Sequence, residues 1–593
     1  MVDIKKLSQH KVWHRLLHYD TKNSNGEIHT KEFYLSKQGR DDPLAELQAT
    51  ITGYSEPWES DGNKHPRCRF PARYYWLDSH LSLPDYNLRE PRCTNLENWA
   101  LFDSAKSISL LLVSGYFGNP ASTFGHALLR INTGAPEDHK GLFDLAINFG
   151  AIVPENEPTP LYIYNGLFGG YQAGFSDRYF YTQDIVYSRT EYRDIWDYKL
   201  NLTKQQRTLL LLHMFEINGK KFTYFFLDEN CVYRFAELLE LVTEENFLEK
   251  AEYWYIPSDL FSTLERINSR QKNSGETEII KSVTFIPSAQ RLLYHRFANL
   301  SKDEAKTANF LIENGIDEHQ QLLDKYPLER QAAILDTILK FQQYRLISEE
   351  PEPQQKTREA KDRALLSRLK LDVISKPLTP IAPLPSPAKG SSPNRVSMGM
   401  SYEKGQPIRS QFSIAPFSQE LLGENSLENG ELVVMETVIG WDKKHDFDLD
   451  RFDLIRVQKL DTPPAQISGE SPWAWRVRMG VDRLYKNHHE GVFTFGIGQG
   501  WKIKPDLSLL AMVDSTIKSN FPHIQTTPHF GAIIKKKKLQ ALFTAGSLIN
   551  VDDSGTKLSL AAQLQYQFSP KWGLRFSTSN SDVNKAALEL VWH

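Results

Sequence analysis

Cys231 is the residue of this chain best placed to act as a nucleophile. It follows an apolar, aromatic segment at residues 222–226 and a polar turn at 228–230. Apolar residues then recur at helical spacing, at Val232, Phe235, Leu238 and Leu239. The pattern predicts a strand, a turn and a helix whose first turn contains Cys231, where backbone amides and the helix dipole would lower the thiol pKa. A buried, inert cysteine is the alternative, because free cysteine is among the most buried residue types.

A cysteine nucleophile needs a base that takes its proton and a partner that orients the base. His126 is the candidate base, near the start of a strand predicted over residues 124–131. Asn148 is preferred to Asp144 as the orienting residue because it lies nearer the strand end, where clefts open. The candidates for holding an oxyanion or the substrate are the backbone amides near Cys231 and the side chains of Asn119, Asn230 and Tyr116. Singly, a strand histidine is more often a satisfied core residue, so it is the combination that favours catalysis.

Three predicted strands, at residues 107–114, 124–131 and 142–151, position these side chains. His126 lies on one face of the second strand, and Asp144 and Asn148 share one face of the third. Polar side chains on the same side of adjoining strands can converge with a cysteine at a helix start.

Two segments lie between the third strand and the helix before Cys231. Residues 158–177 are rich in Gly and Tyr and are expected to form a long loop over one end of the sheet. Residues 179–188 are expected to form another strand. Thr203 and Gln206 predict a capping box for the helix that follows.

The length and charge of the chain exclude some classes of protein. A chain of 593 residues suggests about three or four domains. Its 70 basic and 73 acidic residues nearly cancel, so a nucleic-acid partner is not expected. No run of 18 or more apolar residues occurs, and the first residues lack the apolar core of a signal peptide.

The three cysteines allow one disulfide and one free thiol. Cys68 and Cys93 lie in one N-terminal segment, whereas Cys231 stands apart. We therefore expect a disulfide between Cys68 and Cys93, with Cys231 left free. No metal site and no cofactor are predicted.

The C-terminal third of the chain alternates between apolar and polar residues in about twelve segments. On one of them, Leu558, Leu560 and Leu564 share a face that opposes Gln563, Gln565 and Gln567. Because the polar face includes arginines and many glutamines, an antiparallel outer-membrane barrel is preferred to a soluble sandwich. An even number of strands would leave both ends of the barrel in the periplasm.

Composition divides the chain into five parts. They are an N-terminal accessory domain (1–99), a catalytic domain (100–256), a helical region (257–375), a proline-rich linker (376–393) and the barrel (394–593). The fold class is therefore α+β, with a separate barrel.

The segments NPASTFGHALLRI, LAINFGA and DENC resemble the Lnb N-terminal periplasmic domain family, which includes a lipoprotein N-acyltransferase. The resemblance implies a permuted papain-like fold of the NlpC type, with Cys231 as nucleophile, His126 as base and Asn148 as orienting residue. It implies thioester chemistry at the periplasmic face of a Gram-negative outer membrane. An acyl chain would pass from a phospholipid through Cys231 to an amine, such as the N-terminus of a lipoprotein.

Two other functions remain open at this point. The related fold also houses peptidoglycan amidases and peptidases, so a hydrolase of the NlpC type is one alternative. A non-catalytic outer-membrane scaffold with an inert thiol is the other.

Overall fold

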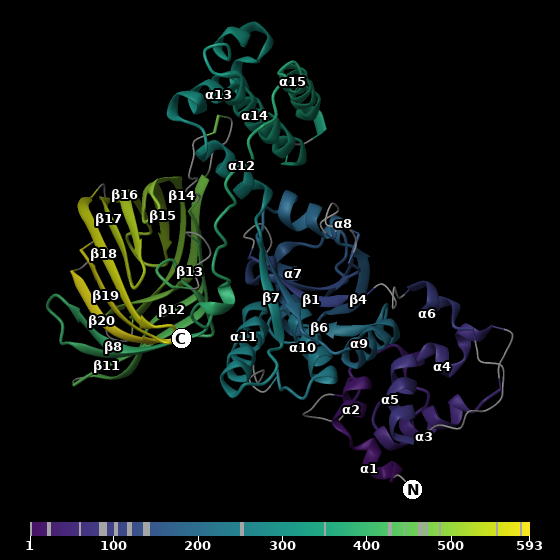
Figure 1. The fold of residues 1–593 in the computed structure, drawn as a ribbon. Coiled ribbons are helices and arrows are strands. Elements are labelled where there is room, and N and C mark those ends of the chain that lie inside the picture. Colours follow the sequence, from purple (N-terminus) through teal and green to yellow (C-terminus); the bar gives the residue numbers. More distant parts are fainter. Residues whose placement is uncertain are drawn as a thin grey trace. The chain divides into compact units, whose positions relative to one another are not determined.

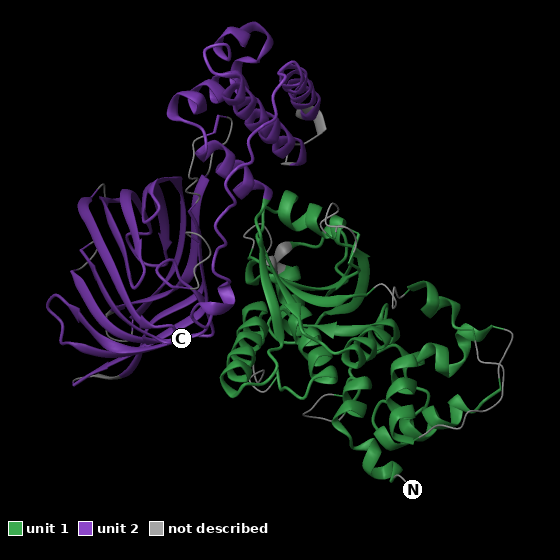
Figure 2. Ribbon diagram, viewed as in Figure 1, with its two compact units in different colours: residues 1–288 green, residues 289–593 purple. Residues whose placement is uncertain are grey.

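The structure, a computed structural model, describes the chain except for residues 1–2, 20–24, 58–60, 82–91, 100–104, 116–120, 135–140, 142, 249–253, 349–350, 425–429, 444, 461–466, 469–472, 486–487, 553–554 and 581–583. The chain divides into two compact units, residues 1–288 and 289–593 (Figure 2). Within the described residues, we find no helix with the length and apolarity needed to cross a membrane.

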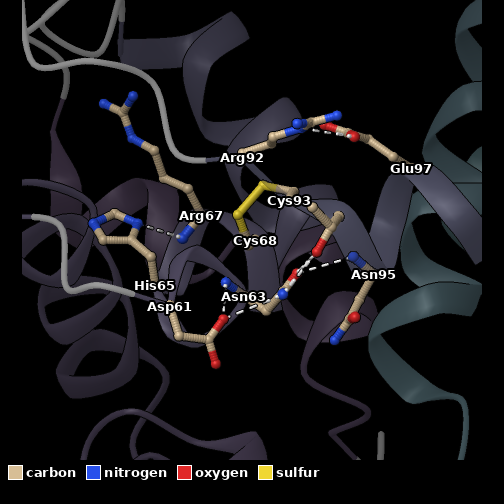
Figure 3. Close-up of a disulfide and its surroundings, with 10 residues drawn as sticks. Asp61, Asn63, His65, Arg67, Cys68, Arg92, Cys93, Asn95 and Glu97 are labelled. Atoms are coloured by element: carbon tan, nitrogen blue, oxygen red, sulfur yellow. Dashed lines mark hydrogen bonds and ion pairs between the residues drawn. A yellow bond between two sulfur atoms is a disulfide. The ribbon is translucent and has the colours of Figure 1, made fainter.

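Short helices make up the N-terminal part of the first unit. They are α1 (Ile4–Ser8), α2 (Lys11–Leu16), α3 (Pro43–Tyr54), α4 (Pro66–Arg69), α5 (Pro71–Leu81) and α6 (Thr94–Trp99). A disulfide joins Cys68 in α4 to Cys93, which directly precedes α6, with 5.1 Å between their Cα atoms (Figure 3). The predicted disulfide is thus present, and Cys231 is a free cysteine.

An antiparallel sheet of seven strands forms the centre of the first unit (Figure 1). In spatial order the strands are β6 (Phe222–Tyr224), β4 (Tyr171–Tyr179), β3 (Leu145–Ala151), β2 (His126–Asn132), β1 (Ser107–Val113), β5 (Ile195–Leu200) and β7 (Ile280–Ile286). The helices α9 (Lys204–Ile217), α10 (Cys231–Val242) and α11 (Pro257–Ser274) accompany it, and α10 contacts β2 and β3. The predicted capping box of Thr203 and Gln206 begins α9.

Two predictions between β3 and β5 are wrong. The segment expected to be a loop contains the helix α7 (Thr159–Phe168) and the strand β4. The glycine that suggested a loop ends the helix, because Gly169 has the left-handed φ of 74° that a helix C-terminus often needs. The strand expected over residues 179–188 is instead the helix α8 (Phe180–Asp184) followed by a π-helical turn, Ile185–Thr190, since β4 has already ended at Tyr179.

The region expected to be helical from residue 257 contains one strand. The segment IKSVTFI forms β7, which pairs with β5 and adds the seventh strand to the sheet. The helices beyond it are α12 (Ala289–Ala298), α13 (Lys302–Asn314), α14 (Leu328–Ser348) and α15 (Pro351–Leu369), and they belong to the second unit.

Twelve antiparallel strands form a closed barrel in the second unit (Figure 1). They are β8 (Arg395–Glu403), β9 (Arg409–Ala415), β11 (Gly430–Asp442), β12 (His445–Lys459), β13 (Trp473–Tyr485), β14 (His488–Lys504), β15 (Leu507–Lys518), β16 (Ile524–Lys536), β17 (Leu539–Asn550), β18 (Thr556–Ser569), β19 (Trp572–Ser579) and β20 (Lys585–Trp592). A short strand, β10 (Phe417–Gln419), also pairs with β11. Pairing of β20 with β8 closes the barrel, and Trp592 opposite Val396 places its two ends at one rim.

The outer face of the barrel is apolar and its interior is polar, which confirms the predicted barrel. Leu558 and Leu560 on β18 are exposed, whereas Gln565 and Gln567 of the same strand are buried. Inside, Glu420 pairs with Arg395 and Arg575, and Glu436 pairs with Arg395, Arg451 and Arg456. A lipid-facing apolar band around a polar interior is the arrangement of an outer-membrane barrel.

Candidate active site

The strand order brings the predicted catalytic residues to one end of the sheet. Val113, the last residue of β1, pairs with His126 on one side and with Ile195 on the other. Asn148 lies on β3, the next strand after β2. Cys231 is the first residue of α10, as predicted, and the side chain of Asn230 caps this helix by accepting from the backbone N–H of Val232 and Tyr233.

Cys231, His126 and Asn148 form a continuous chain of contacts. The Cys231 Sγ lies 3.3 Å from His126 Nδ1, and His126 Nε2 lies 2.7 Å from Asn148 Oδ1. Because the amide oxygen of Asn148 can only accept, His126 Nε2 must carry the proton of the neutral ring. The unprotonated Nδ1 then faces the thiol, so this tautomer can take a proton from Cys231.

Both reacting groups are uncharged in the folded protein. Burial raises the pKa of the Cys231 thiol to about 11, although the backbone N–H groups of Ala127 and Val232 favour the thiolate. Burial also lowers the pKa of His126 to about 4, and the charge of Arg193 lowers it further while Asn148 opposes the shift. The expectation of a lowered thiol pKa is therefore wrong, because desolvation outweighs the helix N-terminus. The resting site is a neutral thiol beside a neutral imidazole.

Arg193 is a further charged residue beside this site, and sequence reasoning missed it. It lies two residues before β5, at the sheet end that carries His126. Its Nη1 pairs with Glu191 at 2.8 Å, and its Nε donates to the Ser114 carbonyl at 2.5 Å. Its guanidinium lies 5.1 Å from the ring of Tyr187, and that ring lies 5.6 Å from the ring of His126. No spacing in the sequence connects Arg193 with Cys231, so only the fold reveals it.

The three residues predicted to hold an oxyanion or the substrate have different outcomes. Asn230 is beside Cys231, but its amide nitrogen donates to the carbonyls of Phe226 and Tyr255, at 3.1 and 2.6 Å. Both hydrogens of the amide are thus used, and Asn230 positions the start of α10 instead of offering a donor to the substrate. Asn119 and Tyr116 lie outside the described residues.

Aromatic residues and an apolar helix surround the site. The Tyr224 hydroxyl interacts electrostatically with the Cys231 thiol and with the hydroxyls of Tyr187 and of Tyr162 in α7. The helix α7 contains no charged residue, and its outward side chains are apolar. They are Leu161, Ile163, Tyr164, Leu167 and Phe168, which are between 37% and 68% exposed. The side of α7 that is packed inward contains Gly166, whose carbonyl accepts from the backbone N–H of Phe226.

One group of side chains in the first unit has the spacing of a metal site. Ligand atoms of His18, Glu27 and Glu237 lie within 4.8 Å of one another. The buried guanidinium of Arg234 already pairs with both carboxylates, and with Glu237 at 2.9 Å. Because a fixed cation neutralises these carboxylates, the group is better explained as a buried ion-pair network.

Comparison with sequence families identifies three segments of the chain. Residues 95–266 match the Lnb N-terminal periplasmic domain. This segment is an Lnb N-terminal periplasmic domain. It spans all three residues of the Cys–His–Asn chain. Residues 5–80 and 384–593 match two families that are each described as a domain of unknown function, DUF7843 and DUF7840. A search of curated proteins returns no match.

Comparison with solved structures finds outer-membrane proteins. The KdgM porin is 9% identical, with 34% of this chain and 98% of that chain covered and a TM-score of 0.23. The outer membrane protein Omp33 of Acinetobacter baumannii is 12% identical, with 35% and 99% covered and a TM-score of 0.21. The NanC porin is 10% identical, with 34% and 99% covered and a TM-score of 0.22. These likenesses concern the fold of the barrel alone.

The Lnb domain and the barrel together place the protein in the envelope of a Gram-negative bacterium. It is an outer-membrane protein with a periplasmic N-terminal part. The barrel begins and ends at one rim, since Trp592 at the end of β20 lies opposite Val396 at the start of β8.

Proposed function

We propose that this protein is a cysteine-dependent acyltransferase that takes an acyl chain from a membrane phospholipid. The observation that carries the proposal is the contact chain from Cys231 Sγ through His126 to Asn148 Oδ1. In that order the three residues have the roles of nucleophile, base and orienting group. The acceptor is an amine, such as the N-terminus of a lipoprotein.

Acylation of Cys231 would begin when His126 Nδ1 takes the thiol proton as the sulfur attacks the ester carbonyl carbon. The imidazolium that forms is stabilised by the carbonyl oxygen of Asn148, which accepts from Nε2–H. The ester C–O bond then breaks, and His126 returns the proton to the departing alcohol oxygen. An acyl thioester remains on Cys231.

In the transfer step, the acceptor amine is the nucleophile and the Cys231 sulfur is the leaving group. The acceptor amine attacks the thioester carbon and loses a proton to His126 Nδ1. The C–S bond breaks, and the departing sulfur recovers that proton, so that the neutral thiol and imidazole are restored. Because both groups are neutral before and after each cycle, the buried site holds a charge pair only while bonds change.

The apolar surface of α7 supports an acyl chain as the substrate. A helix whose outward residues are Leu, Ile, Tyr and Phe exposes apolar area that water solvates poorly. The opposite side of α7 packs against the segment that leads to Cys231, since the Tyr162 ring lies 5.0 Å from the Phe226 ring and the Gly166 carbonyl accepts from the Phe226 N–H. An acyl chain that lies on α7 could therefore extend to the thiol.

Trapping the thioester tests the proposal. The full chain in detergent is incubated with a phospholipid that carries a labelled acyl chain, and the mass of the peptide that contains Cys231 is measured. We expect one acyl group on the wild-type peptide, sensitive to hydroxylamine, and no thioester on the Cys231→Ser variant. A wild-type peptide without label, or equal labelling of the variant, contradicts the proposal. Cleavage of muropeptides without acyl transfer would instead support the NlpC-type hydrolase.

A variant of α7 tests the substrate class in the same assay. Phe168→Asp should slow labelling by about tenfold, since burying an aromatic side chain contributes about 1.5–3 kcal/mol. The matched control is Tyr75→Asp, which changes another exposed aromatic residue of the first unit. Equal rates for Phe168→Asp and Tyr75→Asp would show that α7 does not contact the donor.

A further inference from the structure

Arg193 has one nitrogen that the described part of the protein does not use. The residue is only 2% exposed, and Nη2 is a buried nitrogen without a hydrogen-bond partner among the described residues. By contrast, Nε and Nη1 are fixed by the Ser114 carbonyl and the Glu191 carboxylate. A guanidinium held at two of its nitrogens is rigid, so the direction of the third is set. A buried donor left unpaired is unfavourable, which makes it a natural site for an anionic oxygen.

The position of Arg193 relates it to the reacting groups. Ile195, Val113 and His126 lie opposite one another on three adjacent strands, and Arg193 precedes Ile195 by two residues. The Tyr187 ring contacts both the guanidinium and the imidazole, with centroid distances of 5.1 and 5.6 Å. Arg193 also acts electrostatically on both His126 and Cys231.

The donor ester offers two anionic groups that Arg193 could bind. The oxyanion of a tetrahedral intermediate forms on the carbon bonded to Cys231 Sγ, and its donors must be within hydrogen-bond distance of that oxygen. The backbone N–H groups of Ala127 and Val232 already point at the Cys231 sulfur and can serve that oxygen, which leaves Arg193 Nη2 for a second anionic group of the donor. In a glycerophospholipid, the phosphodiester is attached to the same glycerol as the ester, a few bonds from the carbonyl that Cys231 attacks.

We propose that Arg193 Nη2 binds the phosphodiester of the donor lipid and thereby places the ester carbonyl at Cys231. This inference rests on the proposed acyltransferase function and names the headgroup feature that the site recognises. It makes Arg193 the residue that distinguishes a phospholipid from a neutral glyceride with the same acyl chains.

Two acyl donors separate recognition of phosphate from catalysis. The full chain in a non-ionic detergent receives phosphatidylethanolamine or a diacylglycerol with the same acyl chains, and the rate of Cys231 acylation is measured. Arg193→Gln should lower the rate with the phospholipid by about 10–100-fold, as loss of a charged hydrogen bond does. The rate with diacylglycerol should change by less than about twofold, and Arg193→Lys should fall between wild type and Arg193→Gln. Arg189→Gln, which changes an exposed arginine of the same segment, should match wild type.

A binding measurement separates this inference from the acyltransferase proposal. Dodecylphosphocholine has a phosphodiester and an alkyl chain but no ester, so it can bind without donating an acyl group. It should slow alkylation of Cys231 by iodoacetamide in wild type and in Arg189→Gln, and at least about tenfold more of it should be needed in Arg193→Gln. The neutral dodecyl maltoside should not protect. This result would support the anion site even if no donor acylated Cys231.

Three outcomes would overturn the inference. Equal losses with phospholipid and diacylglycerol would assign Arg193 to the reaction centre or to the local structure. Unchanged rates in Arg193→Gln would show that Nη2 has no role in recognising the donor. Equal protection of wild type and Arg193→Gln by dodecylphosphocholine would show that the phosphodiester binds elsewhere.

Discussion

The barrel interior and the catalytic centre are both buried and polar, yet they handle charge in opposite ways. Inside the barrel, ionised side chains pair with one another, as Glu436 does with Arg395, Arg451 and Arg456. In the Lnb domain, Cys231 and His126 are neutral, and burial moves each pKa in the direction that keeps it so.

The difference indicates which buried polar groups are structural. Removing the partner of a fully paired buried charge strongly destabilises the protein. Such a charge has no hydrogen-bonding capacity left with which to act on a substrate. The neutral thiol and imidazole can exchange a proton, and Arg193 retains a free donor among the described residues. Paired charge therefore stabilises the barrel, whereas neutral or incompletely paired groups identify the reactive site.

Removing the base should have the largest effect. His126→Gln keeps a polar side chain near Asn148 but cannot accept the thiol proton, so acylation of Cys231 should fall by about a thousandfold, within the range for general-base removal. Rates from labelled phospholipid measure the effect, and alkylation of Cys231 by excess iodoacetamide shows that the thiol is still accessible. A loss of less than about tenfold would mean that another group takes the proton.

Removing one charge from the barrel interior should have a smaller effect, and on stability alone. Glu436→Gln would leave three arginine contacts without their carboxylate, which should destabilise the barrel by about 3 kcal/mol. The loss is measured on a gel, as the urea concentration at which half of the protein no longer migrates as the folded, heat-modifiable band. The control is Glu403→Gln, because Glu403 and the exposed Lys585 form a partly exposed pair at 3.6 Å whose loss should cost less than about 1 kcal/mol. Equal midpoints for the two variants would contradict the difference between paired interior charges and surface pairs.

Periodicity predicted much of both regions. The period of two on the strands placed His126 and Asn148 on faces that do meet, and the polar turn before Val232 located the start of α10 at Cys231. The same period separated the two faces of the barrel. These features depend on local sequence, so a local pattern can reveal them.

Features that depend on tertiary packing were missed or wrong. The thiol pKa was expected to be lowered because the helix start is visible in the sequence, whereas the burial that raises it comes from packing. Arg193 reaches the site only because β5 pairs with β1, next to β2. The sequence predicts a loop where α7 forms, because Gly169, which ends the helix, resembles a turn signal. For the thiol pKa and for Arg193, the deciding contacts join residues that are distant in the chain.

Weakening the orientation of the base should have a moderate effect. Asn148→Ala removes the 2.7 Å hydrogen bond to His126 Nε2, so the imidazole is no longer fixed in the tautomer that presents Nδ1 to the thiol. A hydrogen bond to a group that becomes charged contributes about 1.5–3 kcal/mol, which predicts a loss of about tenfold or somewhat more in the acylation rate. Asn148→Gln is the matched control for side-chain polarity. A rate equal to wild type for Asn148→Ala would assign the orienting role to another residue.

The smallest expected effect is that of pH near neutrality, and it tests whether the resting pair is neutral. With the His126 pKa at about 4 and the Cys231 pKa at about 11, both groups keep their neutral forms between pH 6 and 9. The acylation rate should therefore change by less than about twofold across this window. It should fall as the pH approaches 4, because a protonated His126 can no longer accept the thiol proton.

A resting thiolate–imidazolium pair would instead give a bell-shaped profile with at least one limb between pH 6 and 9. Single-turnover rates of the wild-type enzyme would reveal such a limb, and the solubility of the lipid is measured over the same pH range as a control. A limb in the rates that the solubility does not follow would show that the catalytic centre holds a charge pair, as the barrel interior does.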